Sequence, residues 1–197
     1  MKEILVATQN EGKMKEVRAS LNPLGYSCIS LNDISFVGKI EEDGKSFFDN
    51  AYKKAKVISE KYHKIVLADD SGLVVSALPD ELGVKSKRFS KSGEDIDNNK
   101  LLLKKLVNET DRTAYFISQL VIYFPTGKFY TYQGRVYGAI AKDSKGTNGF
   151  GYDPLFIVDE LNVRMAELSK EEKNKISHRG MALEKLVKDI IDEIITV

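Results

Sequence analysis

The chain has 197 residues, of which 42% are hydrophobic and 30% are charged, a balance typical of a globular protein rather than a disordered one. Its 30 basic and 29 acidic residues give a net charge of +1, which excludes a strong overall attraction to nucleic acid or to an anionic membrane. The single cysteine, Cys28, cannot form an internal disulfide, and the amino terminus shows no signal-peptide pattern. These features predict a cytoplasmic protein with no nucleic-acid or membrane partner.

Along the amino-terminal half, short apolar runs alternate with apolar residues at helical spacing. Strands are predicted over residues 4–7, 26–31 and 65–68, and helices from residue 12 or 13 onward and over 46–62. The third strand leads directly into Asp69 and Asp70. Acidic side chains at the carboxyl end of a buried strand lie where α/β proteins usually place their chemistry.

The carboxyl-terminal half predicts a β-hairpin among helices and loops. Its elements are a basic loop over 83–94, a helix over 95–108 with Ile96 inward, hairpin strands over 114–124 and 129–141, a capping box at 169–172 and a last helix capped by Ser177. We therefore predict an α/β fold with a mixed sheet and flanking helices, in which a single domain over 1–197 forms two lobes around a substrate cleft.

Asp69 and Asp70 place two like charges side by side, which repel at neutral pH and so predict a counter-cation. Mg2+ suits this pair because it takes oxygen ligands and commonly bridges carboxylates to phosphates. The alternative is a turn in which Asp and Ser cap the next element. Glu41 and Glu42 belong to a second acidic cluster, which is either a solvated turn or, if folding brings it near, the source of a third metal ligand.

A polar loop connects the first strand to the first helix. It consists of Thr8, Gln9, Asn10, Glu11, Gly12 and Lys13. Backbone amides at a helix amino terminus, together with a lysine, favour a phosphate site. The spacing of a Walker loop is absent, and many loops of this kind bind nothing.

Two later segments predict contacts with a planar ligand. In the glycine-rich segment 146–154, Phe150 and Tyr152 offer flat faces for a base, although aromatics of such a turn also pack into cores. His178 and Arg179 fall in the first turn of the last helix, which is an unfavourable place for cations. They therefore either donate hydrogen bonds to a ligand or are ordinary surface cations.

These motifs, in this order, resemble the inosine triphosphate pyrophosphatase family nearly from end to end. The resemblance rests on Ala7-Thr8-x-Asn10-x-x-Lys13, Glu42-x-Gly44-x-x-Phe47, Asn50-Ala51, Lys54-Ala55, Ala68-Asp-Asp-Ser-Gly-Leu73, Gly149-Phe-Gly-Tyr-Asp-Pro154, Glu171-Glu-Lys173 and Ile176-Ser-His-Arg-Gly180. It implies Mg2+-dependent hydrolysis of non-standard purine nucleoside triphosphates (ITP, dITP and XTP) to the monophosphate and pyrophosphate. It also implies a homodimer.

The resemblance further implies roles for individual residues. Asp70 is expected to be the general base, with Asp69 shaping the metal site and Glu42, or else Glu41, joining Asp70 at Mg2+. The expected substrate contacts are residues 8–13 with Lys54 and Lys173 at the phosphates, Ser71, Phe150 stacked on the base beside Gly151, Tyr152 and Asp153, and His178 and Arg179 at the 6-oxo edge.

The chain departs from the family pattern at a few positions. Gln9 stands where glycine or asparagine is frequent, Asn148 stands where glycine is frequent, and residues 83–89 are unusually basic through Lys85 and Lys87. These departures concern loop conformation and fine specificity rather than the type of reaction. Two alternatives to the expected function remain open. One is a pyrophosphatase for modified pyrimidine nucleotides, and the other is a non-catalytic nucleotide- or RNA-binding module.

Overall fold

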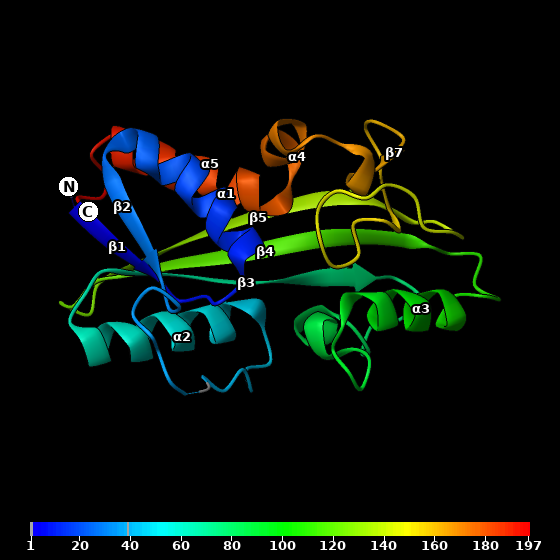
Figure 1. The fold of residues 1–197 in the computed structure, drawn as a ribbon, viewed down its shortest axis with the longest axis horizontal. Helices are drawn as coiled ribbons and strands as arrows, with labels where there is room; N and C mark the ends of the chain where they lie inside the picture. The colour runs from blue at the N-terminus through cyan, green and yellow to red at the C-terminus, as the bar shows by residue number, and fades with distance from the viewer. Residues whose placement is uncertain (1, 39) are drawn as a thin grey trace. The chain divides into compact units, whose positions relative to one another are not determined.

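The computed structural model describes residues 2–38 and 40–197, which form one mixed seven-stranded sheet in the order β2-β1-β3-β4-β5-β6-β7 (Figure 1). The strands are β1 (Lys2–Val6), β2 (Tyr26–Ser30), β3 (Val66–Val75), β4 (Thr113–Tyr123), β5 (Phe129–Ile140), β6 (Phe156–Val158) and β7 (Val163–Arg164). Strand β1 pairs in parallel with β2 and β3, whereas β6 pairs antiparallel with β5 and β7. The predicted mixed sheet with flanking helices is confirmed.

Three of the α-helices, namely the first, second and fourth along the chain, begin at side-chain caps that the sequence provides. The α-helices are α1 (Glu11–Leu21), α2 (Phe47–Tyr62), α3 (Asp95–Lys105), α4 (Lys170–Ile176) and α5 (His178–Ile191), and the 3-10 helices are η1 (Asn22–Leu24), η2 (Gly83–Arg88) and η3 (Met165–Glu167). Capping boxes start α2 at Ser46 and α4 at Ser169. Among the described residues, no helix combines the length and apolar character needed to cross a membrane.

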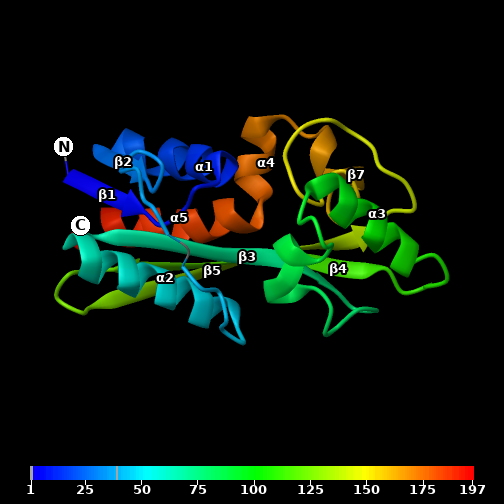
Figure 2. The same cartoon turned by 60° about the horizontal axis from the view of Figure 1, so that its bottom comes forward.

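The chain divides into two compact units, each with its own core. Unit 1 comprises the described part of residues 1–70 with 118–134 and 179–197, and unit 2 comprises 71–117 with 135–178. In unit 1, side chains that alternate along β1 and β3 pack on opposite faces of the sheet. One face packs on α1 and α5, and the other packs on α2 (Figures 1 and 2).

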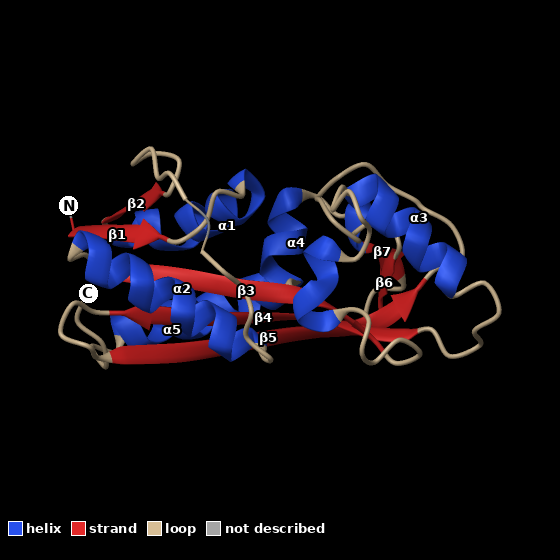
Figure 3. Ribbon diagram, turned by 90° about the horizontal axis from the view of Figure 1, so that it is seen from below, coloured by secondary structure: helices blue, strands red, loops and turns tan. Residues whose placement is uncertain are grey.

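Unit 2 is built around the second half of β3. Leu73 and Val75 from this strand pack in one core with Leu102 of α3, with Leu106 directly after that helix and with Phe156 of β6. Figure 3 shows α3 and the short strands β6 and β7 of this unit. The core of unit 2 therefore depends on β3 continuing beyond the two aspartates.

The structure corrects three details of the prediction. Asp69 and Asp70 lie in the middle of β3 rather than at a strand end or in a turn, because Leu73 and Val75 extend the strand into the core of unit 2. Helix α1 begins at Glu11, slightly earlier than expected, because Asn10 caps it. Ile96 is exposed rather than turned inward, whereas Leu102 of the same helix is buried as expected.

Candidate active site

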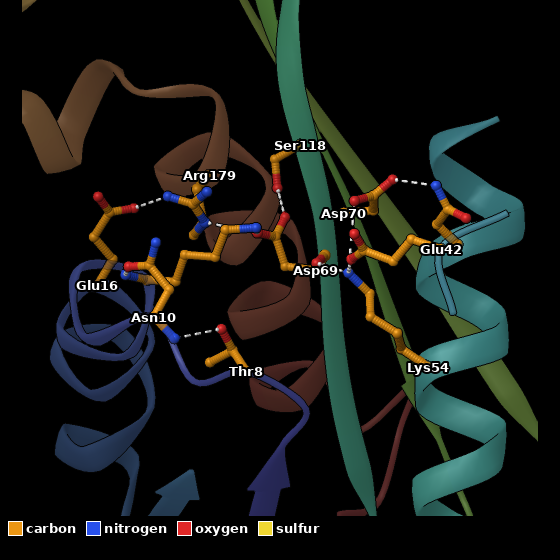
Figure 4. A network of polar contacts seen from close by, with 11 residues as sticks. Thr8, Asn10, Glu16, Glu42, Lys54, Asp69, Asp70, Ser118 and Arg179 are labelled. Atoms are coloured by element: carbon orange, nitrogen blue, oxygen red, sulfur yellow. Dashed lines mark hydrogen bonds and ion pairs between the residues drawn. The ribbon is translucent and has the colours of Figure 1, made fainter. Parts of the chain in front are cut away.

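Asp69 and Asp70 point to opposite faces of β3 because successive side chains of a strand alternate (Figure 4). Asp69 shares its face with Lys13 of α1 and Arg179 of α5, and Asp70 faces α2. The counter-cations of Asp69 are thus protein side chains. The cation nearest to Asp70 is Lys54, and the expected Mg2+ stays a prediction for this carboxylate.

Asp69 is held by three side chains from three different elements. Its Oδ2 lies 2.7 Å from Lys13 Nζ and 3.1 Å from Arg179 Nε, and its Oδ1 accepts a hydrogen bond of 2.6 Å from Ser118 Oγ. Arg179 Nη1 in turn lies 2.7 Å from Glu16 Oε2. These side chains form a network of alternating charge in unit 1, which is buried except at the half-buried Lys13.

Electrostatics fix the ionised form of Asp69. Burial alone would raise its pKa, but Arg179 and Lys13 outweigh burial and hold the pKa well below the usual range. The pKa of Lys13 is lowered, mainly because burial disfavours its charge and despite the attraction of Asp69. Asp69 is thus an anion throughout the physiological pH range.

Asp70 has weaker compensation. Asn50 Nδ2 donates to its Oδ2 at 3.0 Å, and Lys54 Nζ lies 3.5 Å from its Oδ1. Lys54 is closer to two other acceptors, Glu42 Oε1 at 2.7 Å and the Asp69 carbonyl oxygen at 2.8 Å. Burial raises the pKa of Asp70, and Lys54 does not fully reverse this effect.

The polar loop between β1 and α1 is organised by its own side chains. Thr8 Oγ1 accepts from the Asn10 amide at 3.1 Å, and Asn10 Oδ1 accepts from the Lys13 amide at 3.1 Å. Residues 8–13 are exposed or half-buried, and Glu11 Oε1 accepts from Asn32 Nδ2. The loop thus combines the predicted helix start with Lys13, which links it to Asp69.

The acidic cluster splits between two lysines of α2. Glu42 joins Asp70 around Lys54, whereas Glu41 is 77% exposed and lies 3.9 Å from Lys53 Nζ. Across the described residues, no group of three or more His, Cys, Asp or Glu side chains is arranged to hold a metal ion. Asp70 and Glu42 suit a Mg2+ ion that takes one or two protein carboxylates and completes its shell with phosphates and water.

In unit 2, a short segment that we call the base loop (residues 149–153) carries the half-buried Phe150. The Phe150 amide donates to Asp153 Oδ2 at 2.9 Å, and Lys173 forms an ion pair with the same carboxylate. Lys173 Nζ also lies 4.6 Å from the centre of the Phe150 ring. Phe150, Asp153 and Lys173 are thus brought together.

Other predicted residues of unit 2 lie differently. Tyr152 is a core residue whose hydroxyl donates to the Ser86 carbonyl oxygen at 2.7 Å, so its ring does not offer the flat face that we expected for a base. His178 is buried, with its ring stacked on Phe116 at 5.0 Å between centroids. Ser71 follows Asp70 on β3 and is half-buried.

Arg179 lies in the first turn of α5, as predicted, but it is not a surface cation. It is 1% exposed, and its Nε and Nη1 are engaged by Asp69 and Glu16. The position unfavourable for a cation is thus explained by two buried carboxylates.

Sequence reasoning assigned no role to three residues of the site. These residues are Glu16, Asn50 and Ser118, which contact Arg179, Asp70 and Asp69, respectively. Asn50 stands in one of the family motifs, which is a usable signal. Glu16 and Ser118 give no comparable signal, because their partners lie more than 40 positions away in the sequence.

Comparison with known proteins adds independent evidence. The chain is 49% identical to a Bacillus licheniformis protein named dITP/XTP pyrophosphatase, over 94% of this chain and 96% of that one. It is 46% identical to the Geobacter sulfurreducens protein of the same name, over 96% of each chain. The structure matches the Staphylococcus aureus Ham1 protein with a TM-score of 0.88 and 38% identity, over 98% of this chain and 100% of that one.

A Coxiella burnetii HAM1 protein matches with a TM-score of 0.89 and 36% identity, again over 98% and 100% of the two chains. The family model described as the Ham1 family covers residues 4–189 of this chain. The resemblance found in the motifs is thereby confirmed, and the chain belongs to the Ham1 family.

Proposed function

We propose that this chain hydrolyses ITP, dITP and XTP to the nucleoside monophosphate and pyrophosphate, which removes non-standard purines from the nucleotide pool. The observation that carries the proposal is Asp70, a buried carboxylate with a raised pKa beside Lys54 and Glu42. Relatives at 41–49% identity bear the name dITP/XTP pyrophosphatase, which supports the same substrate class.

Asp70 is assigned as the general base that takes a proton from the attacking water. In the metal-free protein, burial raises the pKa of Asp70 and so makes it a stronger base than an ordinary aspartate, whereas Mg2+ bound beside it would lower that pKa again. Asn50 donates to Oδ2 and so orients the carboxyl group. Cleavage of the α–β phosphoanhydride then releases pyrophosphate.

The lysines are assigned to the negative charge of the triphosphate. Lys13 is positioned at the start of α1 by Asp69, and Lys54 is positioned on α2 by Glu42. Cations placed where charge develops stabilise the transition state of phosphoryl transfer. When phosphates bind, they compete with these carboxylates for the two ammonium groups.

Asp70 and Glu42 are assigned as the protein ligands of Mg2+, which would neutralise phosphate charge when bound. The fit rests on two carboxylates that reach one point around Lys54 Nζ. Glu41 is not assigned, because its side chain faces solvent and Lys53. Asp69 supports this site through its backbone carbonyl, which accepts from Lys54.

For the base, we assign stacking to Phe150, whose backbone amide is held by Asp153. Lys173 lies beside the Phe150 ring and pairs with Asp153, and its expected contact with the phosphates stays a prediction. Recognition of the 6-oxo group by His178 and Arg179 stays a prediction. Two guanidinium nitrogens of Arg179 already bind carboxylates, so we expect its contribution to run mainly through Asp69. A donor at the 6-oxo edge would reject adenine, whose amino group would leave that donor unpaired.

The decisive experiment measures Mg2+-dependent release of pyrophosphate from ITP, dITP and XTP against ATP and GTP, with orthophosphate followed in parallel. We expect pyrophosphate from the first three nucleotides and little from the others. Orthophosphate would instead indicate cleavage at the terminal phosphate. Activity confined to methylated pyrimidine nucleotides would replace the proposed substrate class with the alternative one.

We also propose that the chain works as a cytoplasmic homodimer and as one functional domain with two lobes. Sedimentation equilibrium of the purified chain tests the dimer directly. A monomer at micromolar concentration with full ITP turnover would contradict it.

A further inference from the structure

Helix α3 of unit 2 holds the base loop through two hydrogen bonds to Gly151. The amide of Gly151 donates to Asp95 Oδ2 at 2.7 Å, and its carbonyl oxygen accepts from Asn99 Nδ2 at 2.9 Å. Asp95 and Asn99 are four positions apart, so they project from the same face of the helix. The backbone N–H and the carbonyl oxygen of Gly151 are thus both held by one helix.

The base loop needs such a constraint because its own backbone is permissive. Gly149 and Gly151, which flank Phe150, have φ values of +79° and +64°. Glycine enters this region without steric cost and leaves it as readily. Asp153 fixes the loop before Phe150 through the Phe150 amide, and α3 fixes it after Phe150 through Gly151.

Asp95 also connects the base loop to the basic segment that distinguishes this chain. Its Oδ1 lies 3.0 Å from Lys87 Nζ, while its Oδ2 serves Gly151. The Lys87 side chain is largely exposed, so this ion pair contributes little stability by itself. The same helix also fixes the basic segment, because Asn98 Oδ1 accepts from the Ser90 amide at 2.7 Å.

We propose that Asp95 and Asn99 are positioning residues for the base: they hold Gly151 so that the Phe150 ring is preset for stacking. This inference rests on the proposed function. Neither residue is assigned a contact with substrate. Stacking requires a defined ring position, and a preset ring avoids the entropy cost of ordering the loop on binding.

The role predicts a loss that depends on the base of the ligand. In Asp95→Ala and Asn99→Ala, we expect KM for ITP and the inhibition constant of inosine monophosphate to rise about tenfold, as loss of one charge-assisted or buried hydrogen bond implies. Inorganic tripolyphosphate carries no base. Its inhibition constant should stay within about twofold, because the contacts of unit 1 with phosphate are untouched.

Two further variants separate positioning from simple damage to the helix. Asp97→Ala is the matched control, since Asp97 lies in the same helical turn but accepts from Ser92 Oγ and does not contact the base loop. Asp95→Asn keeps an acceptor oxygen and should restore most of the affinity for inosine monophosphate. Asn99→Asp places a carboxylate against the Gly151 carbonyl oxygen and should bind at least as weakly as Asn99→Ala.

An equal rise for tripolyphosphate and inosine monophosphate in both alanine variants would overturn the proposal, as would unchanged affinity for both ligands. Weakening by Asp97→Ala to the same extent would also overturn it. The failure of the underlying function is recognised separately, because a wild-type chain without ITP turnover would refute the hydrolase. Turnover in the wild type with unaltered inosine monophosphate affinity in Asp95→Ala would refute only the positioning role.

Discussion

The two faces of β3 treat two neighbouring aspartates in opposite ways. Asp69 has two cations and a hydroxyl on its carboxylate, and its pKa lies well below the usual range. The Asp70 carboxylate accepts a hydrogen bond from the side-chain amide of Asn50 and lies near one lysine, Lys54, which it shares with Glu42. The pKa of Asp70 is raised. Both side chains are buried, so burial is not the cause of the contrast.

The difference shows that the supply of cations, rather than burial, separates a structural carboxylate from a reactive one. A buried carboxylate that is surrounded by cations stays ionised and holds those cations in place. A buried anion with too little positive charge is a stronger base and is suited to accept a proton. We therefore expect substitutions of Asp69 to affect stability first and substitutions of Asp70 to affect turnover first.

The largest effect is expected on turnover in Asp70→Asn, which tests whether Asp70 is the reactive carboxylate. Loss of a general base lowers kcat by about 10²–10⁴-fold. Binding of ITP should persist, because Lys13 and Lys54 remain. Steady-state pyrophosphate release and equilibrium binding of ITP measure the two quantities, and near-normal turnover would remove Asp70 from its role.

Asp69→Asn tests whether Asp69 is a structural carboxylate that stabilises the fold. Removing the negative charge of Asp69 costs about 3–5 kcal/mol of unfolding free energy, because the fully buried Arg179 then keeps only Glu16 as a negative partner and the half-buried Lys13 loses its ion pair. Urea unfolding of the metal-free protein measures this loss. Ser118→Ala is the control, since it removes a single hydrogen bond to Asp69 and should cost about 1–2 kcal/mol. An equal loss in the two variants would refute the charge argument.

Asp69 and Asp70 should contribute with opposite signs to the pH dependence of the unfolding free energy. The lowered pKa of Asp69 contributes stability above about pH 4, the unfolded value, and this contribution is lost as pH falls below it. The raised pKa of Asp70 instead creates a cost that appears as pH rises above about 4. Urea unfolding between pH 3 and 7 without metal should therefore show a flatter acid loss in Asp69→Asn and increased stability near neutral pH in Asp70→Asn. The same slope in both variants would contradict the assignment.

Local signals in the sequence predicted much of the fold. The capping box at Ser169 and the turn between β4 and β5 are set by residues within a few positions, so the helix α4 and the hairpin were predicted correctly. The 3-10 helix η2 within the predicted basic loop and the short strands β6 and β7 were not predicted. The extent of β3 was not predicted either, because it depends on the distant core contacts of Leu73 and Val75. Local propensity cannot report such tertiary contacts.

The candidate site was predictable as a set of residues but not as an arrangement. The adjacent charges predicted a counter-cation but not which partners each carboxylate has, and strand alternation assigns Asp69 and Asp70 to separate networks. Alternation would have been predicted if β3 had been extended through both residues. The pairing of Arg179 with Glu16 had no local signal, since 163 positions separate them.

The smallest effect is expected on the Mg2+ requirement, and it distinguishes Glu42 from Glu41 in the acidic cluster. Glu42→Gln should raise the Mg2+ concentration needed for half-maximal turnover by about tenfold, since a loss of 10–100-fold follows when groups that support a metal site are removed. Glu41→Gln is the matched control and should leave that requirement unchanged, because Glu41 is exposed and paired only weakly with Lys53. Titration of turnover with Mg2+ at saturating ITP distinguishes the two glutamates. Glu41→Gln and Glu42→Gln could instead raise the Mg2+ concentration for half-maximal turnover by the same factor. The acidic cluster would then attract Mg2+ through its overall charge, and contact with Lys54 would not identify the carboxylate that binds the metal.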